Sequence, residues 1–155
     1  MYLSGKICKV EIYSDAHFMK LAYQEAEKAE ARDEVPVGAI IVSDHQIIAR
    51  GHNLTETLND VTAHAEMQVI TAAANTLGSK YLWDCTLYVT LEPCPMCAGA
   101  LFWSQISRIV YAASDVKRGY RTVNSKMLHP KTKIESGLME EEAAEILVNF
   151  FRKKR

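Results

Sequence analysis

The chain has 155 residues, of which 48% are hydrophobic and 24% charged. This is the balance of an ordinary soluble globular protein, so we expect residues 1–155 to form a single domain, with residues 1–13 as a loose N-terminal arm. The net charge of −1 excludes a general electrostatic attraction to nucleic acid, and any site for a polyanion must come from a local cluster.

The first predicted helix is amphipathic and begins at Ser14 or Asp15, either of which can cap it. Its apolar residues recur at spacings of three and four: Phe18, Leu21, Ala22, Ala26 and Ala29. The helix should end before Pro36, because the residue before a proline disfavours helical angles. Residues 37–42 and 46–51 then read as two strands of a hairpin.

A polar loop over residues 52–62 leads to a second helix, predicted for about residues 63–77 with Gly78 as its stop. A strand at 86–91, a helix that opens at Pro95 and a strand at 108–113 follow. This alternation favours a parallel sheet with helices packed on its faces. After a basic, polar segment over 114–129, we expect a short strand around Ile134 and a closing helix over 140–152.

Two short motifs carry the chemistry: His64-Ala65-Glu66 and, thirty residues later, Pro93-Cys94-Pro95-Met96-Cys97. Proline is favoured in the first position of a helix, which makes Cys94 the cap and places Cys97 in the first turn. The helix dipole there favours thiolates, which are the form that zinc binds. His64 also stands at a predicted helix start, with Thr62 or Asp60 as the expected cap.

The ligand count indicates a catalytic metal site. His64, Cys94 and Cys97 supply three ligands, and catalytic zinc sites keep a further position for water, whereas structural sites use four protein ligands. Cys85 is predicted at the opposite end of its strand and Cys8 in the unpatterned arm, so we expect both to be ordinary thiols. Glu66 is then free to move protons during attack on a base.

Each motif alone is weak evidence. A lone C-x-x-C is often a structural zinc knuckle or a redox pair, and a lone H-x-E on a helix is usually surface chemistry. Together and in this chain order, H-x-E and P-C-x-x-C are the signature of zinc-dependent nucleobase deaminases. The cysteine usage, the absence of a signal peptide and the lack of a long apolar window predict a cytoplasmic protein.

The sequence resembles bacterial tRNA-specific adenosine deaminases over about residues 15 to 155. The similarity is carried by residues 34–39, 62–67, 86–100 and 104–110, and by the terminal Asn149-Phe150-Phe151-Arg152. The resemblance implies a cytidine-deaminase-like α/β fold, with three α/β/α layers around a mixed sheet of about five strands. It also implies one Zn²⁺ per chain, a homodimer, and conversion of the wobble adenosine of a tRNA anticodon to inosine.

The resemblance also assigns roles to residues. Asn53 matches the position that hydrogen-bonds the flipped base, and Ala65, Glu92 and Pro93 match positions that line the zinc pocket. We expect two basic clusters to contact tRNA phosphates: Lys117, Arg118 and Arg121, and then Arg152 and Lys153. The alternative interpretation is that these clusters have no binding role and are simply solvated helix ends or loops.

Two other functions share the zinc motif. One is deamination of guanine or of another free nucleobase or nucleoside, because related guanine deaminases often carry Pro-Cys-Pro-Met-Cys. In addition, Tyr120-Arg121-Thr122 stands where the tRNA enzymes usually have small residues. Such an enzyme should close its site with the C-terminal segment, whereas an RNA enzyme must leave a groove open. The other is a noncatalytic zinc-stabilised RNA-binding domain, which would have no use for Glu66.

Overall fold

The computed structural model describes residues 12–155, so most of the predicted arm, residues 1–11, lies outside the described part. The elements in chain order are α1 (Asp15–Ala31), β1 (Gly38–Ser43), β2 (Gln46–His52), α2 (Ala65–Leu77), β3 (Cys85–Leu91), α3 (Pro95–Ser104), β4 (Arg108–Ala113), a 3₁₀ turn (Tyr120–Thr122), β5 (Lys133–Ser136) and α4 (Glu140–Lys153). Within residues 12–155, no helix is long and apolar enough to cross a membrane.

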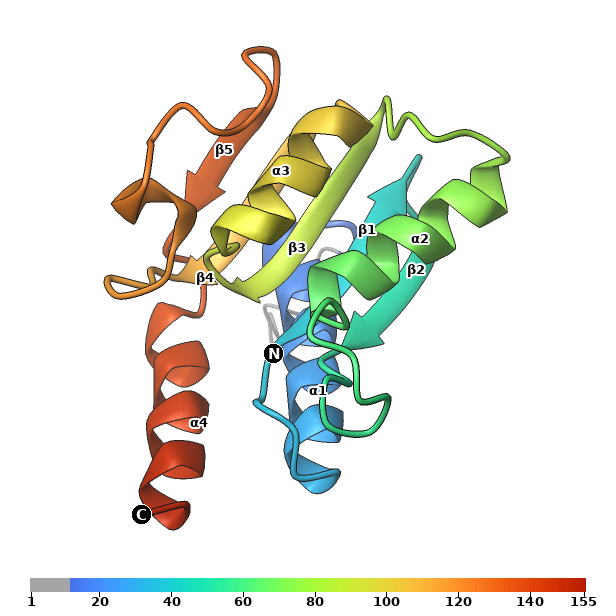
Figure 1. The fold of residues 1–155 in the computed structure, drawn as a ribbon. Helices are drawn as coiled ribbons and strands as arrows, with labels where there is room; N and C mark the ends of the chain where they lie inside the picture. Colours follow the sequence, from blue (N-terminus) through green and yellow to red (C-terminus); the bar gives the residue numbers. More distant parts are fainter. Residues whose placement is uncertain (1–11) are drawn as a thin grey trace, which may run out of the picture.

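Five strands form one mixed sheet in the order β2-β1-β3-β4-β5 (Figure 1). β3, β4 and β5 are parallel, as the alternation of strands and helices predicts. β1, however, is antiparallel to both β2 and β3, so the expectation of a parallel sheet is wrong for this half. The reason is that α2 carries the chain from β2 across to β3, which leaves β1, the first strand of the hairpin, between two strands of opposite direction.

The hairpin turn is set by two residues, Asp44 and His45, both with positive φ (49° and 61°). Two-residue turns of this kind match the twist of the strands they join. The turn sets the first pairs, Ser43 with Gln46 and Val42 with Ile47. A shift of one residue between Val42 and Ile41 then sets the rest, so the pairing ends at Gly38 opposite His52. Asn53, the next residue, is therefore placed at the same edge of the sheet as the start of β1.

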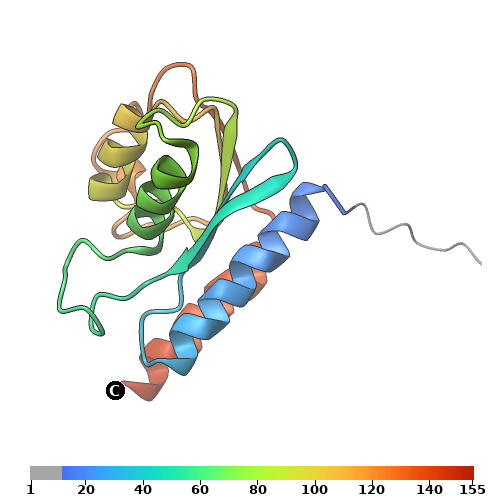
Figure 2. The ribbon, with the colours of Figure 1, turned by 90° about the vertical axis from the view of Figure 1, so that its right-hand side faces the viewer.

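Helices cover both faces of the sheet: α2 and α3 lie on one face, and α1 and α4 lie side by side on the other (Figure 2). β1 shows how one strand serves both layers, because its side chains alternate. Ala39 and Ile41 pack in the cluster with α2 and α3, whereas Ile40 and Val42 pack in the cluster with α1 and α4. The predicted three-layer α/β fold is confirmed.

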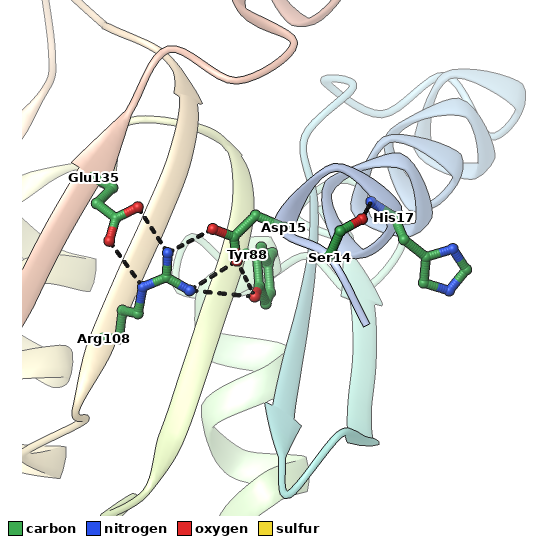
Figure 3. Close-up of polar contacts among 6 residues, drawn as sticks. All are labelled: Ser14, Asp15, His17, Tyr88, Arg108 and Glu135. Atoms are coloured by element: carbon green, nitrogen blue, oxygen red, sulfur yellow. Dashed lines mark hydrogen bonds and ion pairs between the residues drawn. The ribbon is translucent and has the colours of Figure 1, made fainter. Parts of the chain in front are cut away.

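Arg108, the first residue of β4, ties α1 and β5 to the sheet (Figure 3). Its guanidinium donates to both oxygens of Asp15 at the start of α1 (2.8 and 2.6 Å) and to both oxygens of Glu135 on β5 (3.1 and 2.7 Å). The Tyr88 hydroxyl also donates to Asp15 (2.7 Å). Ser14 caps α1 by accepting a hydrogen bond from the His17 N–H (3.1 Å), as predicted.

Candidate metal centre and active site

The two cysteines lie at the start of α3, where the sequence predicts them. Cys94 is the N-cap residue, Pro95 occupies the first helical position, and Cys97 is buried in the first turn. The Ala98 N–H donates to the Cys94 carbonyl (2.8 Å), which closes the first turn. β3, the strand that precedes Cys94, is mostly buried and lies beside the buried strand β4. The start of α3 therefore follows a well-packed strand.

His64 comes from a different helix start. α2 begins at Ala65, two residues later than predicted, and His64 itself is the N-cap, without a side-chain capping bond. Asp60 does not cap the helix; its carboxylate accepts from the N–H and the hydroxyl of Thr62 (2.8 and 2.7 Å). Because the His64 side chain does not cap its own helix, its imidazole is free to face the cysteines.

The three ligand atoms form a compact triangle. His64 Nδ1 lies 3.6 Å from Cys94 Sγ and 3.5 Å from Cys97 Sγ. In a tetrahedral zinc site, with Zn–S about 2.3 Å and Zn–N about 2.0 Å, sulfur and nitrogen ligands lie about 3.5 Å apart. The donor set and its spacing therefore fit zinc. Among residues 12–155, no other His, Cys, Asp or Glu joins a group of three with its ligand atoms this close.

The electrostatics of the triangle favour a thiolate at Cys94 and a thiol at Cys97. Hydrogen bonding from the Cys97 thiol, and then His64 and the Cys97 backbone N–H, lower the pKa of Cys94 to about 4. The hydrogen bond that the Cys97 thiol donates to the Cys94 thiolate, together with burial, raises the pKa of Cys97. The hydrogen bond to Cys94 raises the pKa of His64. Cys85 lies at the other end of β3 and is buried, and burial raises its pKa, as expected of an ordinary thiol.

Glu66 lies beside the triangle without belonging to it. It is on the first turn of α2 and is only 4% exposed. Burial raises the pKa of its carboxyl to about 7, against the opposing effect of His64. A carboxyl that titrates near neutrality is suited to accept and release protons at physiological pH.

Asn53 is buried at the edge of this site and fixes the start of α2. Its Oδ1 accepts from the Ala65 N–H (2.8 Å), and its Nδ2 donates to the Val35 carbonyl (3.1 Å). One amide hydrogen and one lone pair remain for a ligand. The structure thus brings Asn53, Ala65 and Glu66 together.

Glu92 and Pro93 directly precede Cys94, one of the three candidate metal ligands, and are both buried. The Glu92 carboxylate does not face an open pocket, because it accepts from Arg121 (Nη2–Oε1, 2.7 Å; Nε–Oε1, 3.2 Å). The Pro93 carbonyl accepts from the Tyr120 N–H (2.9 Å). Arg121, expected as a phosphate contact, therefore has its charge engaged within the protein.

The remaining basic residues fall in two places. Lys117 and Arg118 are exposed in the loop after β4, and their N–H groups donate to the Asp115 carboxylate (3.1 and 3.0 Å). Arg152 and Lys153 lie in the last turn of α4. That end of α4 points away from the starts of α2 and α3 (Figure 1), so the structure does not bring the two clusters together.

Sequence reasoning missed Glu34. This residue is fully buried, and its carboxylate accepts from the N–H groups of Glu56 and Thr57 (2.8 and 3.2 Å) and from the Thr57 hydroxyl (3.2 Å). It therefore holds the loop that leads to His64. A charged residue next to Val35-Pro36 gives no local signal of partners twenty residues away.

Comparisons with known proteins agree with this site. The chain matches the cytidine and deoxycytidylate deaminase zinc-binding region over residues 12–113. A tRNA-specific adenosine deaminase of Agrobacterium fabrum is 50% identical over 144 residues, which cover 90% of this chain and 95% of that protein.

Two solved structures are also similar. One comes from a study of A-to-I editing by tRNA:A34 deaminases at the wobble position of transfer RNA, with a TM-score of 0.78 and 48% identity over 84% of this chain and 99% of that one. The other is a guanine deaminase of Bacillus subtilis, with a TM-score of 0.63 and 44% identity over 65% of each chain.

Proposed function

Because the chain belongs to the cytidine and deoxycytidylate deaminase family, and within it to the tRNA-specific adenosine deaminases, we propose that His64, Cys94 and Cys97 hold its zinc ion and that Glu66 is the catalytic acid–base. The reaction is hydrolytic deamination of adenosine to inosine at the wobble position of a tRNA anticodon. The observation that carries the chemistry is the three-ligand triangle beside a buried carboxylate that is not a ligand.

Zinc in this site supplies Lewis acidity, which lowers the pKa of water toward neutrality. Glu66 accepts one proton from the attacking water and delivers it to the ring nitrogen N1. It then accepts the second proton from the oxygen now bonded to C6 and delivers it to the amine that leaves C6. Adenosine and water thus become inosine and ammonia, and the carboxyl returns to its starting state.

The base is held next to Glu66 by groups that the fold already positions. Asn53 is locked by Ala65 and Val35, so its remaining amide hydrogen and lone pair keep a fixed direction for the base. The Ala65 and Glu92-Pro93 backbone forms the adjoining wall. Because the Asn53 side chain is already fixed, little conformational entropy is lost when the flipped base binds to it.

Lys117 and Arg118 contact phosphates next to the wobble nucleotide, because their loop is anchored to Glu92-Pro93 beside the zinc ligands. Arg152 and Lys153 would meet the RNA only beyond the anticodon loop.

A homodimer is supported by α3, which exposes 76% of Trp103 and 36% of Met96 on the outer face of its layer. We also propose that the chain forms a single domain and that the protein acts in the cytoplasm.

Deamination of guanine or another free nucleobase is the alternative that a specific observation favours, namely the similarity to a guanine deaminase over 65% of the chain. Such an enzyme needs its site closed by the C-terminal segment. In this chain α4 packs against β3 and β4, on the face opposite α2 and α3 (Figure 2). This arrangement supports an open site that RNA can reach.

The test is to incubate zinc-loaded protein with an anticodon stem-loop carrying a wobble adenosine, and separately with guanine, adenine, cytosine and their nucleosides. Inosine in the stem-loop with no change in the free compounds is the expected result. Turnover of guanine with an untouched stem-loop would replace the proposal with nucleobase deamination. Tight binding of zinc and stem-loop with no ammonia released from any substrate would instead indicate a noncatalytic domain.

A further inference from the structure

The loop between β4 and the 3₁₀ turn wraps around one buried carboxylate. Glu92 is 3% exposed, and three groups of the loop donate to it: the Asp115 N–H (3.3 Å), the Arg121 N–H (3.3 Å) and the Arg121 guanidinium (2.7 Å). The same guanidinium donates to the Ser114 hydroxyl (2.9 Å). Both ends of the loop are therefore fastened at a single point.

The fit between loop and carboxylate is close. A Cβ on Gly119 would lie 2.0 Å from Glu92 Oε2 and 2.6 Å from the Asp115 carbonyl oxygen, so a side chain there cannot coexist with this arrangement. Gly119 has φ −64°, so the requirement is for space and not for an unusual backbone angle. Its N–H donates to the Asp115 carbonyl (2.9 Å), which narrows the loop further.

This point of attachment lies between the RNA-facing loop and the zinc site. Glu92 stands two residues before Cys94, and Pro93, between them, accepts from the Tyr120 N–H. The tip of the loop exposes Lys117 and Arg118. The Arg121 side chain is 46% exposed, and its guanidinium pairs with the buried Glu92 carboxylate and lies over the Tyr111 ring at 5.6 Å.

We propose that Glu92 and Arg121 are positioning residues, which hold Lys117 and Arg118 in the orientation that receives the substrate backbone. The inference rests on the proposed function, because it assigns a task to the loop in that reaction. Arg121 acts through Glu92 and makes no phosphate contact of its own. The stretch Tyr120-Arg121-Thr122 is then an anchor, with Tyr120 buried in the core and Arg121 neutralising the Glu92 carboxylate.

The test compares three single variants on the wobble-adenosine stem-loop. Arg121→Ala removes the anchor, and Gly119→Ala displaces the loop from Glu92 while Arg121 keeps its charge. Lys133→Ala is the control, because it removes one exposed cation at the start of β5, at the opposite end of the sheet from Cys94. Zinc content and the thermal transition are measured for each.

Arg121→Ala and Gly119→Ala should raise KM about two- to fivefold, the range expected for a partly exposed ion pair, with kcat within about twofold and zinc unchanged. The double variant should be no worse than the more affected single variant, since both act on one attachment. Lys133→Ala should match the wild type.

Salt dependence separates anchoring from direct contact. A lost phosphate contact flattens the slope of log KM against log salt by about 0.7 to 0.9, as Lys117→Ala should do. For Arg121→Ala, the plot of log KM against log salt should instead run parallel to that of the wild type. The entropic cost of ordering a looser loop on RNA binding is the same at every salt concentration.

A flattened slope for Arg121→Ala, additive effects in the double variant, or a KM equal to that of Lys133→Ala would overturn the proposal. If Gly119→Ala does not retain zinc, the KM and the salt dependence of Arg121→Ala alone test the proposal. Wild-type protein that leaves the stem-loop untouched would overturn the proposed function first, and so the two failures are distinguishable.

Discussion

Replacing Arg108 by Met tests the cluster that joins α1, β4 and β5 (Figure 3). Methionine keeps the apolar stem of the side chain, so the loss reports the charged contacts and not the packing. The Arg108 side chain is 23% exposed, that of Asp15 37% and that of Glu135 55%, so solvent screens both pairs. Screened pairs contribute about 0.2 to 1 kcal/mol each, and the two-pronged contact with Asp15 belongs at the upper end.

We therefore expect Arg108→Met to lower the free energy of unfolding by about 1 to 2 kcal/mol. For a chain of this size each kcal/mol corresponds to about 2 to 4 °C in the thermal midpoint. Urea unfolding followed by circular dichroism measures the change, and Lys133→Met is the matched control, since Lys133 forms no ion pair with another residue of 12–155.

The pH dependence has a definite sign. Hydrogen bonding from Arg108 lowers the pKa of Asp15 below its ordinary value of 3.8. A depressed carboxyl pKa contributes stability above the unfolded value, and this contribution is lost as the pH falls through the folded value. The difference between wild type and Arg108→Met should thus be constant from neutral pH down to about 5 and shrink below 3.8. A difference that grows on acidification, or one no larger than that of Lys133→Met, would refute this reasoning.

Three further outcomes are expected. Glu66→Gln should reduce kcat on the stem-loop by about 10²- to 10⁴-fold with one zinc per chain retained, as turnover and metal analysis on the same sample can check; unchanged turnover would remove Glu66 from the mechanism. Cys94→Ala should abolish stoichiometric zinc and the stabilisation that added zinc gives the wild type in thermal melts, and full zinc occupancy would contradict the ligand assignment. Gly38→Ala should cost about 3 kcal/mol in urea unfolding, because a Cβ there would lie 2.1 Å from the Ala22 carbonyl oxygen and 2.3 Å from the Ala26 nitrogen; an effect below about 0.5 kcal/mol would mean that β1 and α1 separate easily.

The candidate metal group could be predicted because its signal is local. Pro95 marks a helix start, which places Cys94 and Cys97 within one turn, and the structure confirms this arrangement. The hairpin of β1 and β2 is local in the same sense, since Asp44 and His45 set it. The antiparallel pairing of β1 with β3 could not be predicted from the order of elements, because it depends on the side on which α2 crosses the sheet.

The roles of buried charges were also out of reach of the sequence. Glu34 and Glu92 accept hydrogen bonds from loops that follow more than twenty residues later in the chain. No residue spacing in the sequence predicts these contacts. Arg121 was predicted as a phosphate contact because its neighbours Lys117 and Arg118 are basic. The folded loop instead turns its guanidinium toward Glu92, which follows β3 at the same edge of the sheet where the loop leaves β4.

The most direct test of the whole account is deamination of the stem-loop in water enriched in heavy oxygen. The product is cut by a base-specific ribonuclease into short oligonucleotides, which are sequenced by tandem mass spectrometry, with Glu66→Gln protein in parallel. The account predicts inosine at the wobble position alone, with one heavy oxygen at C6 and one ammonia released for each inosine. Inosine without the label, modification at other adenosines, or equal product from Glu66→Gln protein would contradict it.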